Sequence, residues 1–176
     1  SVIEGQLQPY GISALDRLTG KLAAWKPAPD NVVLTLAVST NTVYLGGAFT
    51  QVGGQLRNRI AAVDGVTGKA TDWNPDANGP VSKIVIAGGT AYVGGMFTYI
   101  GGQARNFIAA IDLETGRATD WNPNANGVVR SIAVSSNLVY VGGEFLQIGG
   151  QARRKLAALD ILTGAHDRPL GGGEVA

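Results

Sequence analysis

The sequence predicts an all-β repeat protein, built as about three and a half four-stranded blades of a β-propeller that form a partial ring. Aromatic and arginine residues recur every 48 residues, and residues 30–77 are identical to residues 78–125 at 25 of 48 positions. Apolar and polar residues alternate within each repeat, as in strands, and no helical apolar stripe occurs. The recurring residues are Trp25, Trp73 and Trp121; Tyr44, Tyr92 and Tyr140; Phe49, Phe97 and Phe145; and Arg57, Arg105 and Arg153.

Each 48-residue repeat has room for four short strands separated by turn residues. In the first full repeat we expect strands at 32–39, 42–52, 59–64 and 69–73, with a GGQLRN loop at 53–58 between the second and third strands. A WNPDANG loop at 73–79 leads to the next repeat, because proline and glycine exclude regular structure there. A β-solenoid is the competing architecture, but its coils are usually shorter and lack four antiparallel strands.

The repeats divide the chain into a single repeat domain. Residues 1–29 match only the second half of a blade, and residues 30–77 and 78–125 are complete blades. Residues 126–173 form a blade with a divergent end, in which HDRPLGGG replaces the DWNP sequence. A ring needs about four blades or more. We therefore expect either a fragment of a longer chain or copies that associate to close the ring.

The amino-acid composition excludes several classes of function. The chain has 26 glycines in 176 residues, a charged fraction of 15% and a net charge of +1. Scattered charge of this kind does not suit nucleic acid, and no apolar run is long enough for a membrane span. There are no cysteines, which excludes disulfides and thiolate metal sites. We expect no metal, no cofactor and no catalytic constellation, and the single histidine, His166, is interpreted as a surface substitution.

The candidate ligand-binding residues lie in the GGQ-x-R and WNP-x-ANG loops. Alternation of antiparallel strands places both loops at the same end of a blade, so they decorate one face of the ring. Their side chains can bind protein partners, sugar hydroxyls or carboxylates, or they can brace one blade's loop against the next. The candidates are Gln55, Arg57, Asn58, Asn74, Gln103, Arg105, Asn106, Asn122, Gln151 and Arg153.

Two other recurring residue types have structural roles that compete with ligand binding. An aspartate precedes each Thr-Gly turn, where its carboxylate can accept turn N–H bonds; one aspartate per blade does not supply the ~6–8 oxygens of a calcium site. Each tryptophan precedes a proline loop and can pack between blades or, if exposed, stack on a sugar. The aspartates are Asp16, Asp64, Asp112 and Asp160.

Three copies of one sequence pattern resemble known propeller repeats. The copies are YLGGAFTQVGGQLRNRIAAVDGVTG, YVGGMFTYIGGQARNFIAAIDLETG and YVGGEFLQIGGQARRKLAALDILTG. They are similar to the bacterial propeller repeats known as delta-sixty-type or as a domain of unknown function, over nearly the whole chain. They resemble, more distantly, the cortical landmark proteins of fungal bud-site selection. The bacterial resemblance implies an extracellular or cell-surface location in large multidomain proteins. Proteins with these repeats usually have no assigned activity.

The string AVDGVTGKATDW is similar to the docking motif of quinoprotein propellers. Trp73 lies one residue further along than that motif requires, and alternation along a strand would turn its indole to the opposite face. We therefore expect a non-catalytic scaffold or protein-interaction propeller. A lectin-like glycan-binding propeller is the alternative, and a quinoprotein-like oxidoreductase is disfavoured.

Overall fold

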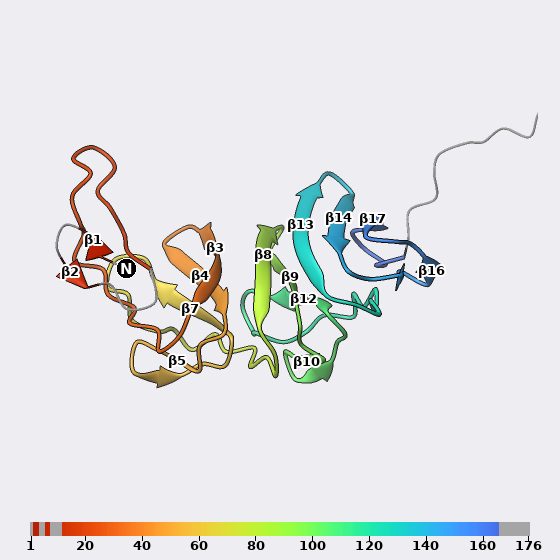
Figure 1. Ribbon diagram of the computed structural model, residues 1–176, viewed down its shortest axis with the longest axis horizontal. Coiled ribbons are helices and arrows are strands. Elements are labelled where there is room, and N and C mark those ends of the chain that lie inside the picture. The colour runs from red at the N-terminus through yellow and green to blue at the C-terminus, as the bar shows by residue number, and fades with distance from the viewer. Residues whose placement is uncertain (1, 4–5, 8–11, 166–176) are drawn as a thin grey trace, which may run out of the picture.

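A computed structural model describes residues 2–3, 6–7 and 12–165. Within these residues the chain contains strands and turns and no helix, which confirms the all-β prediction. No helix capable of crossing a membrane therefore occurs in this part of the chain. Figure 1 shows the strands gathered into groups that follow one another from one end of the molecule to the other.

The groups repeat the same five strands in the same order. A hairpin of β1 (Val2–Ile3) and β2 (Gln6–Leu7) comes first. Unit 1, residues 30–77, contains β3 (Val33–Ser39), β4 (Thr42–Gly47), β5 (Gln51–Val52), β6 (Gln55–Leu56) and β7 (Ile60–Asp64). Unit 2, residues 78–125, contains β8 (Val81–Ala87), β9 (Thr90–Gly95), β10 (Tyr99–Ile100), β11 (Gln103–Ala104) and β12 (Ile108–Asp112). Unit 3, residues 126–165, contains β13 (Val129–Ser135), β14 (Leu138–Gly143), β15 (Gln147–Ile148), β16 (Gln151–Ala152) and β17 (Leu156–Asp160).

Each unit is a small antiparallel sheet with a separate two-residue hairpin beside it. In unit 1 the sheet order is β3-β4-β7, and β5 pairs with β6 alone. Tyr44 in β4 lies opposite Ala37 on one side and Ala62 on the other. The register shifts between Val33 and Thr35, and units 2 and 3 repeat this irregularity at the corresponding place. The same sequence pattern therefore gives the same register in each unit.

The predicted fourth strand is reduced to a single bridge, between Val63 and Ala70 in unit 1 and between Ile111 and Ala118 in unit 2. The chain leaves the sheet shortly after this bridge. In unit 1 Trp73 packs against the next unit, and Pro75 has no N–H to donate to a ladder. The fourth strand of unit 3, with His166, lies outside the described residues. In units 1 and 2 the expected four-stranded sheet is thus three strands and a bridge.

The second predicted strand is also divided. In unit 1, β4 ends at Gly47, and β5 forms the hairpin with β6 that was expected to be the GGQLRN loop. Gly53 and Gly54 make this tight turn with φ angles of 60° and 75°. Glycine adopts such positive φ angles without strain, and the GGQ string recurs at the same turn in units 2 and 3.

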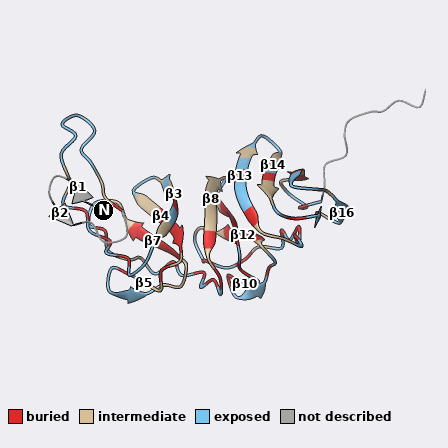
Figure 2. Cartoon of the chain, viewed as in Figure 1, coloured by how far each residue is buried: buried red, intermediate tan, exposed pale blue. Residues whose placement is uncertain are grey.

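The apolar core lies between the units rather than inside any one of them. Tyr44, Ile60 and Trp73 of unit 1 pack in one cluster with Val81 and Ile84 of unit 2. A second cluster joins units 2 and 3 in the same way, and a third joins unit 1 to residues 12–29. Figure 2 shows buried segments in β7, β8 and β12, and exposed loops around them. Each sheet is therefore stabilised by its neighbours.

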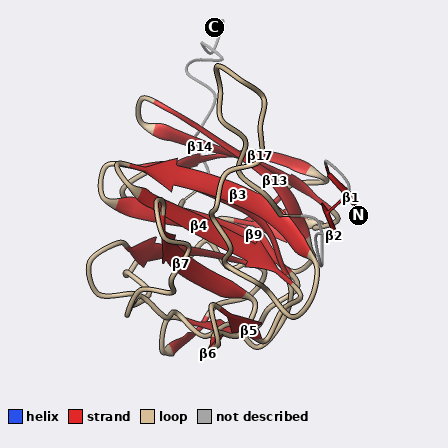
Figure 3. Ribbon diagram, turned by 90° about the vertical axis from the view of Figure 1, so that its left-hand side faces the viewer, coloured by secondary structure: helices blue, strands red, loops and turns tan. Residues whose placement is uncertain are grey.

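Glycines in β4 and β9 allow this close approach. A Cβ atom on Gly94 would lie 2.5 Å from Cγ1 of Val129 in unit 3, and one on Gly46 would lie 2.5 Å from Cγ1 of Val81 in unit 2. In Figure 3 the sheets are seen one behind another. The described units form an open row and not a closed ring (Figure 1), so the propeller stays a prediction.

Candidate functional site

The two loops that carry the predicted ligand-binding residues do meet at one end of each pair of units. The N–H of Gly101 in the unit 2 hairpin turn donates a 2.6 Å hydrogen bond to the carbonyl of Pro75 in the linker. The N–H of Asn78 donates to the carbonyl of Tyr99 at 3.1 Å. The linker from unit 1 is therefore fixed to the hairpin of unit 2, and the candidate residues lie where two units join.

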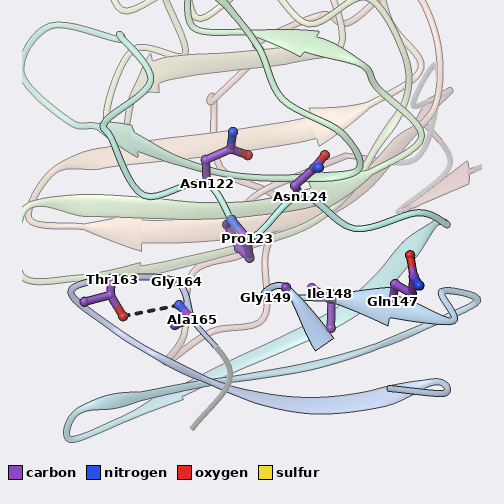
Figure 4. Close-up of a pocket in the computed structure, with 10 residues that line it drawn as sticks. Asn122, Pro123, Asn124, Gln147, Ile148, Gly149, Thr163, Gly164 and Ala165 are labelled. Carbon is purple, nitrogen blue, oxygen red and sulfur yellow. Dashed lines mark hydrogen bonds between the residues drawn. The ribbon is translucent and has the colours of Figure 1, made fainter. Parts of the chain in front are cut away.

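Two equivalent pockets open at these junctions. The pocket between units 1 and 2 has a volume of about 420 Å³ and is lined by Asn74, the Gly101–Gln103 turn and residues 115–118. Its counterpart between units 2 and 3 has a volume of about 490 Å³. Figure 4 shows this second pocket, with Asn122, Pro123 and Asn124 on one side and the Gln147–Gly149 segment and the turn at Thr163 on the other. The Asp-x-x-Thr-Gly turns thus line these pockets together with the two loops that were predicted to share one face.

Arg105 is buried and is used within its own unit. Its Nη2 donates to the carbonyl of Thr119 at 2.7 Å and to Oε1 of Gln103 at 2.8 Å, and its Nη1 donates to the carbonyl of Ala104. Its Nε is buried without a hydrogen-bond partner. The guanidinium therefore ties the β10–β11 hairpin to the segment after the bridge at Ala118. This is the bracing role, although it lies within a unit and not between two.

Arg57 repeats this arrangement in unit 1, and Arg153 stands at the corresponding position in unit 3. Arg57 donates to the carbonyls of Leu56 and Thr71 at 2.7 Å and 2.6 Å, and its Nε is also buried and unpartnered. Arg153 is half-buried and donates to the carbonyl of Ala152 at 3.0 Å. An arginine fork satisfies two backbone acceptors at once, which lysine cannot do with the same geometry. We infer that this is why arginine stands at all three positions.

The asparagines of the hairpins bind the linker. Asn58 Nδ2 donates to the carboxylate of Asp76 at 2.7 Å, and Asn106 Nδ2 donates to Oδ1 of Asn124 at 2.8 Å. Asp76 and Asn124 have φ angles of 54° and 51°, a conformation that aspartate and asparagine tolerate better than most residues. The side-chain hydrogen bond therefore holds the linker at the residue with a positive φ angle.

The remaining candidates are on the surface. Gln103 is exposed, although its Nε2 lies 3.3 Å from the carbonyl of Ala118. The other exposed candidates are Gln55, Asn74, Asn122 and Gln151. The structure thus divides the predicted set into side chains that brace a hairpin or a linker and exposed side chains, of which Asn74, Gln103 and Asn122 line the pockets.

The recurring aspartates organise the turns, as expected. In unit 2, one carboxylate oxygen of Asp112 accepts bonds from the N–H groups of Glu114 and Thr115 and from the hydroxyl of Thr115. The hydrogen bond from the Thr115 hydroxyl is the largest cause that lowers the pKa of Asp112 below the ordinary value of 3.8, and the bond from the Thr115 N–H is the second. The pKa values of Asp16 and Asp64 are lowered by the equivalent threonine hydroxyl and N–H, and that of Asp160 is lowered by the N–H and then the hydroxyl of Thr163. These carboxylates accept hydrogen bonds from N–H and hydroxyl groups of their own turns, which is the structural role expected from the sequence.

The tryptophans pack between units. Trp73 is buried, makes an edge-to-face contact with Tyr44 at 5.0 Å between ring centroids, and donates from Nε1 to the carbonyl of Asp112 in unit 2. The argument from strand alternation does not apply to Trp73, because the fourth strand is only a bridge at Ala70. The expected packing role of Trp73 is confirmed, and the face expected from the one-residue offset stays a prediction. Sugar stacking is ruled out for these buried indoles.

The fold has a counterpart among solved structures. It is similar to the crystal structure of the computationally designed Ika8 protein, with a TM-score of 0.57 and 20% sequence identity. The match covers 89% of this chain and 42% of that protein, so this chain spans less than half its length. At this identity the likeness concerns the fold alone. No family model matches the chain, and no curated protein matches it in sequence.

Proposed function

We propose that the chain is part of a β-propeller that acts as a non-catalytic scaffold for protein interactions. The 48-residue repeat, the antiparallel units and the cores between them support this architecture. The resemblance of the repeats to bacterial propeller repeats supports a location outside the cell or at its surface. The module provides a rigid surface whose shape is set by the joined loops.

The observation that carries this proposal is the use of polar candidate residues to brace the chain's own hairpins and linkers. Arg105 is buried against backbone carbonyls, and Asn106 is bonded to Asn124. A ligand could recruit the guanidinium of Arg105 only by breaking bonds that hold a hairpin. Such a face is better suited to a protein partner that binds through shape complementarity than to a small polar ligand that needs free hydrogen-bonding groups.

A specific observation favours a second candidate, glycan binding. The two junction pockets are equivalent, polar and open, and exposed amide side chains such as Asn74 and Asn122 line them. Amide groups and backbone N–H groups can bind sugar hydroxyls. A lectin of this kind would carry one shallow site at each junction.

A glycan array distinguishes the two candidates. The scaffold proposal predicts no saturable signal for the wild-type protein. A saturable signal that is lost in N122A and kept in N137A, a change of an exposed asparagine in the turn between β13 and β14, would replace the scaffold with the glycan-binding function. Circular dichroism of both variants verifies that the fold is retained.

A further inference from the structure

A further pocket opens between units 2 and 3, and it shares no residue with the two junction pockets. It is lined by the turn between β8 and β9, the turn between β13 and β14, and the turn that follows β17, so it is called the turn pocket below. Its volume is about 650 Å³. Pockets for small molecules typically have volumes of ~300–1,000 Å³. The turn pocket therefore has the size of a small-molecule site, and the packing of two neighbouring units sets its shape.

The apolar part of the lining is held in place by the core between units 2 and 3. Tyr92 and Trp121 are each 5% exposed and form an edge-to-face pair with ring centroids 5.2 Å apart. Val134 and Ile161 are half-buried and pack against the same cluster. Small-molecule pockets are mainly apolar and largely pre-formed. These side chains therefore offer an apolar ligand a fixed surface.

The polar part of the lining offers hydrogen-bond acceptors and one charge. The exposed carboxylate of Asp120 forms no ion pair in the described part of the chain. The hydroxyl groups of Tyr92, Thr90 and Ser136 likewise have no hydrogen-bond partner among the described residues. Burial raises the pKa of Tyr92, so this hydroxyl stays neutral. No lysine, arginine or histidine belongs to the described lining, and Asp120 supplies its only charge.

This set of groups matches a protonated amine. A carboxylate accepts hydrogen bonds and donates none, and hydroxyl oxygens accept as well, whereas an ammonium group donates three and accepts none. We propose that the turn pocket binds a small organic amine as its cation, with the ammonium group at Asp120 and the apolar body against Val134 and Ile161. A ligand with a carboxylate would instead meet the like charge of Asp120. The proposal goes beyond the scaffold function and does not depend on it.

The corresponding place between units 1 and 2 carries larger side chains. Thr40 stands where unit 2 has Gly88, and Ile86 stands where unit 3 has Val134. Thr40 and Gly88 have similar φ angles of 50° and 56°, so the backbone is alike and the side chain makes the difference. Both replacements add volume where a ligand would lie. We therefore expect the amine to bind between units 2 and 3 and not between units 1 and 2.

Nuclear magnetic resonance of nitrogen-15-labelled protein gives the first test, because each tryptophan has its own indole N–H signal. Single Trp→Phe variants assign the signals of Trp25, Trp73 and Trp121. Phenethylamine should shift the Trp121 signal saturably, with a dissociation constant of about 1 mM, which a ligand of this size can reach. The signals of Trp25 and Trp73 should not move. Phenylacetate, which has a similar size and the opposite charge, should not bind.

Three results of this titration would overturn the proposal. They are the lack of a saturable shift of Trp121 at a tenfold higher concentration of phenethylamine, an equal shift of Trp73, and equal binding of phenylacetate. The first result would mean that the pocket holds no amine. The second would mean that the amine does not distinguish the two places, and the third that the charge of Asp120 does not select the ligand.

A matched pair of variants tests the charge itself. D120N should weaken phenethylamine binding by about 2- to 5-fold, because an exposed ion pair contributes modestly. D72N makes the same change at the corresponding position between units 1 and 2, so it should bind like the wild type. Both aspartates are exposed, so the fold should be retained, and circular dichroism verifies this. Unchanged binding by D120N, or equal weakening in D72N, contradicts the placement of the ammonium group at Asp120.

Discussion

The indole Nε1 of Trp73 donates a 3.0 Å hydrogen bond to the carbonyl oxygen of Asp112, which lies in the next unit. Trp25 and Asp64, and Trp121 and Asp160, are related in the same way at the same distance. The carboxylate of Asp112 holds its own turn at the same time. One aspartate thus fixes a turn and receives the tryptophan of the preceding unit, and this repeated pair joins the units.

Trp73 should contribute to stability mainly through its buried ring. W73F keeps a six-membered ring but loses the five-membered ring of the indole and its hydrogen bond to Asp112, so we expect the free energy of unfolding to fall by about 1–2 kcal/mol. W73A should cost ~3–5 kcal/mol, because it leaves a cavity between units 1 and 2. Urea unfolding followed by circular dichroism measures both values. Equal losses for the two variants would show that the hydrogen bond dominates over packing.

Gly94 should be intolerant of a side chain because of Val129. The added methyl group of G94A would meet Cγ1 of Val129, and overpacking of this kind costs about 1–3 kcal/mol. V129A removes the obstructing atom at the cost of a small cavity. We expect the double variant G94A/V129A to be more stable than the sum of the single losses predicts. Additive losses in this double-mutant cycle would mean that the two residues do not meet across the units.

Asp112 should give the protein an acid-sensitive contribution to stability. Its pKa is lowered in the folded protein, so the unfolded chain binds the proton more tightly. The stabilising contribution is therefore present above about pH 4, the unfolded pKa, and is lost as the pH falls through the folded pKa. D112N keeps a similar shape and cannot titrate. Urea unfolding at several pH values should show a smaller acid-dependent fall in stability for D112N than for the wild type.

Arg105 should be more important for stability than its counterpart Arg153. Arg105 is buried, whereas Arg153 is only half-buried. We expect R105M to lower the free energy of unfolding by at least about 3 kcal/mol, since three bonds from a charged donor are lost, each contributing ~1.5–3 kcal/mol, and methionine keeps only part of the packing. R153M should cost less than half as much. Thermal unfolding of the two variants compares them directly, and equal losses would contradict the bracing role.

Much of the candidate site could be predicted, because the repeat makes each position visible several times. The hairpin and linker residues were located correctly, since antiparallel topology requires both loops at one end of a unit. The bonds of Arg105 to Thr119 could not be predicted, because they depend on how far the fourth strand continues. Asn106 and Asn124 are 18 residues apart, and nothing in their identity indicates that they are hydrogen-bonded.

The sequence by itself determined the all-β class, the 48-residue unit and the turn role of the aspartates. These depend on local pattern and on spacing, which a linear chain records directly. Only the tertiary structure decided that the fourth strand is a bridge, that the arginines are braces, and that the core lies between units. The physical reason is that each sheet is too small to bury its own apolar faces, so the fate of a side chain depends on the neighbouring unit. Leu36 and Ile84 occupy the same place in the repeat, and only the neighbour decides which of them is buried.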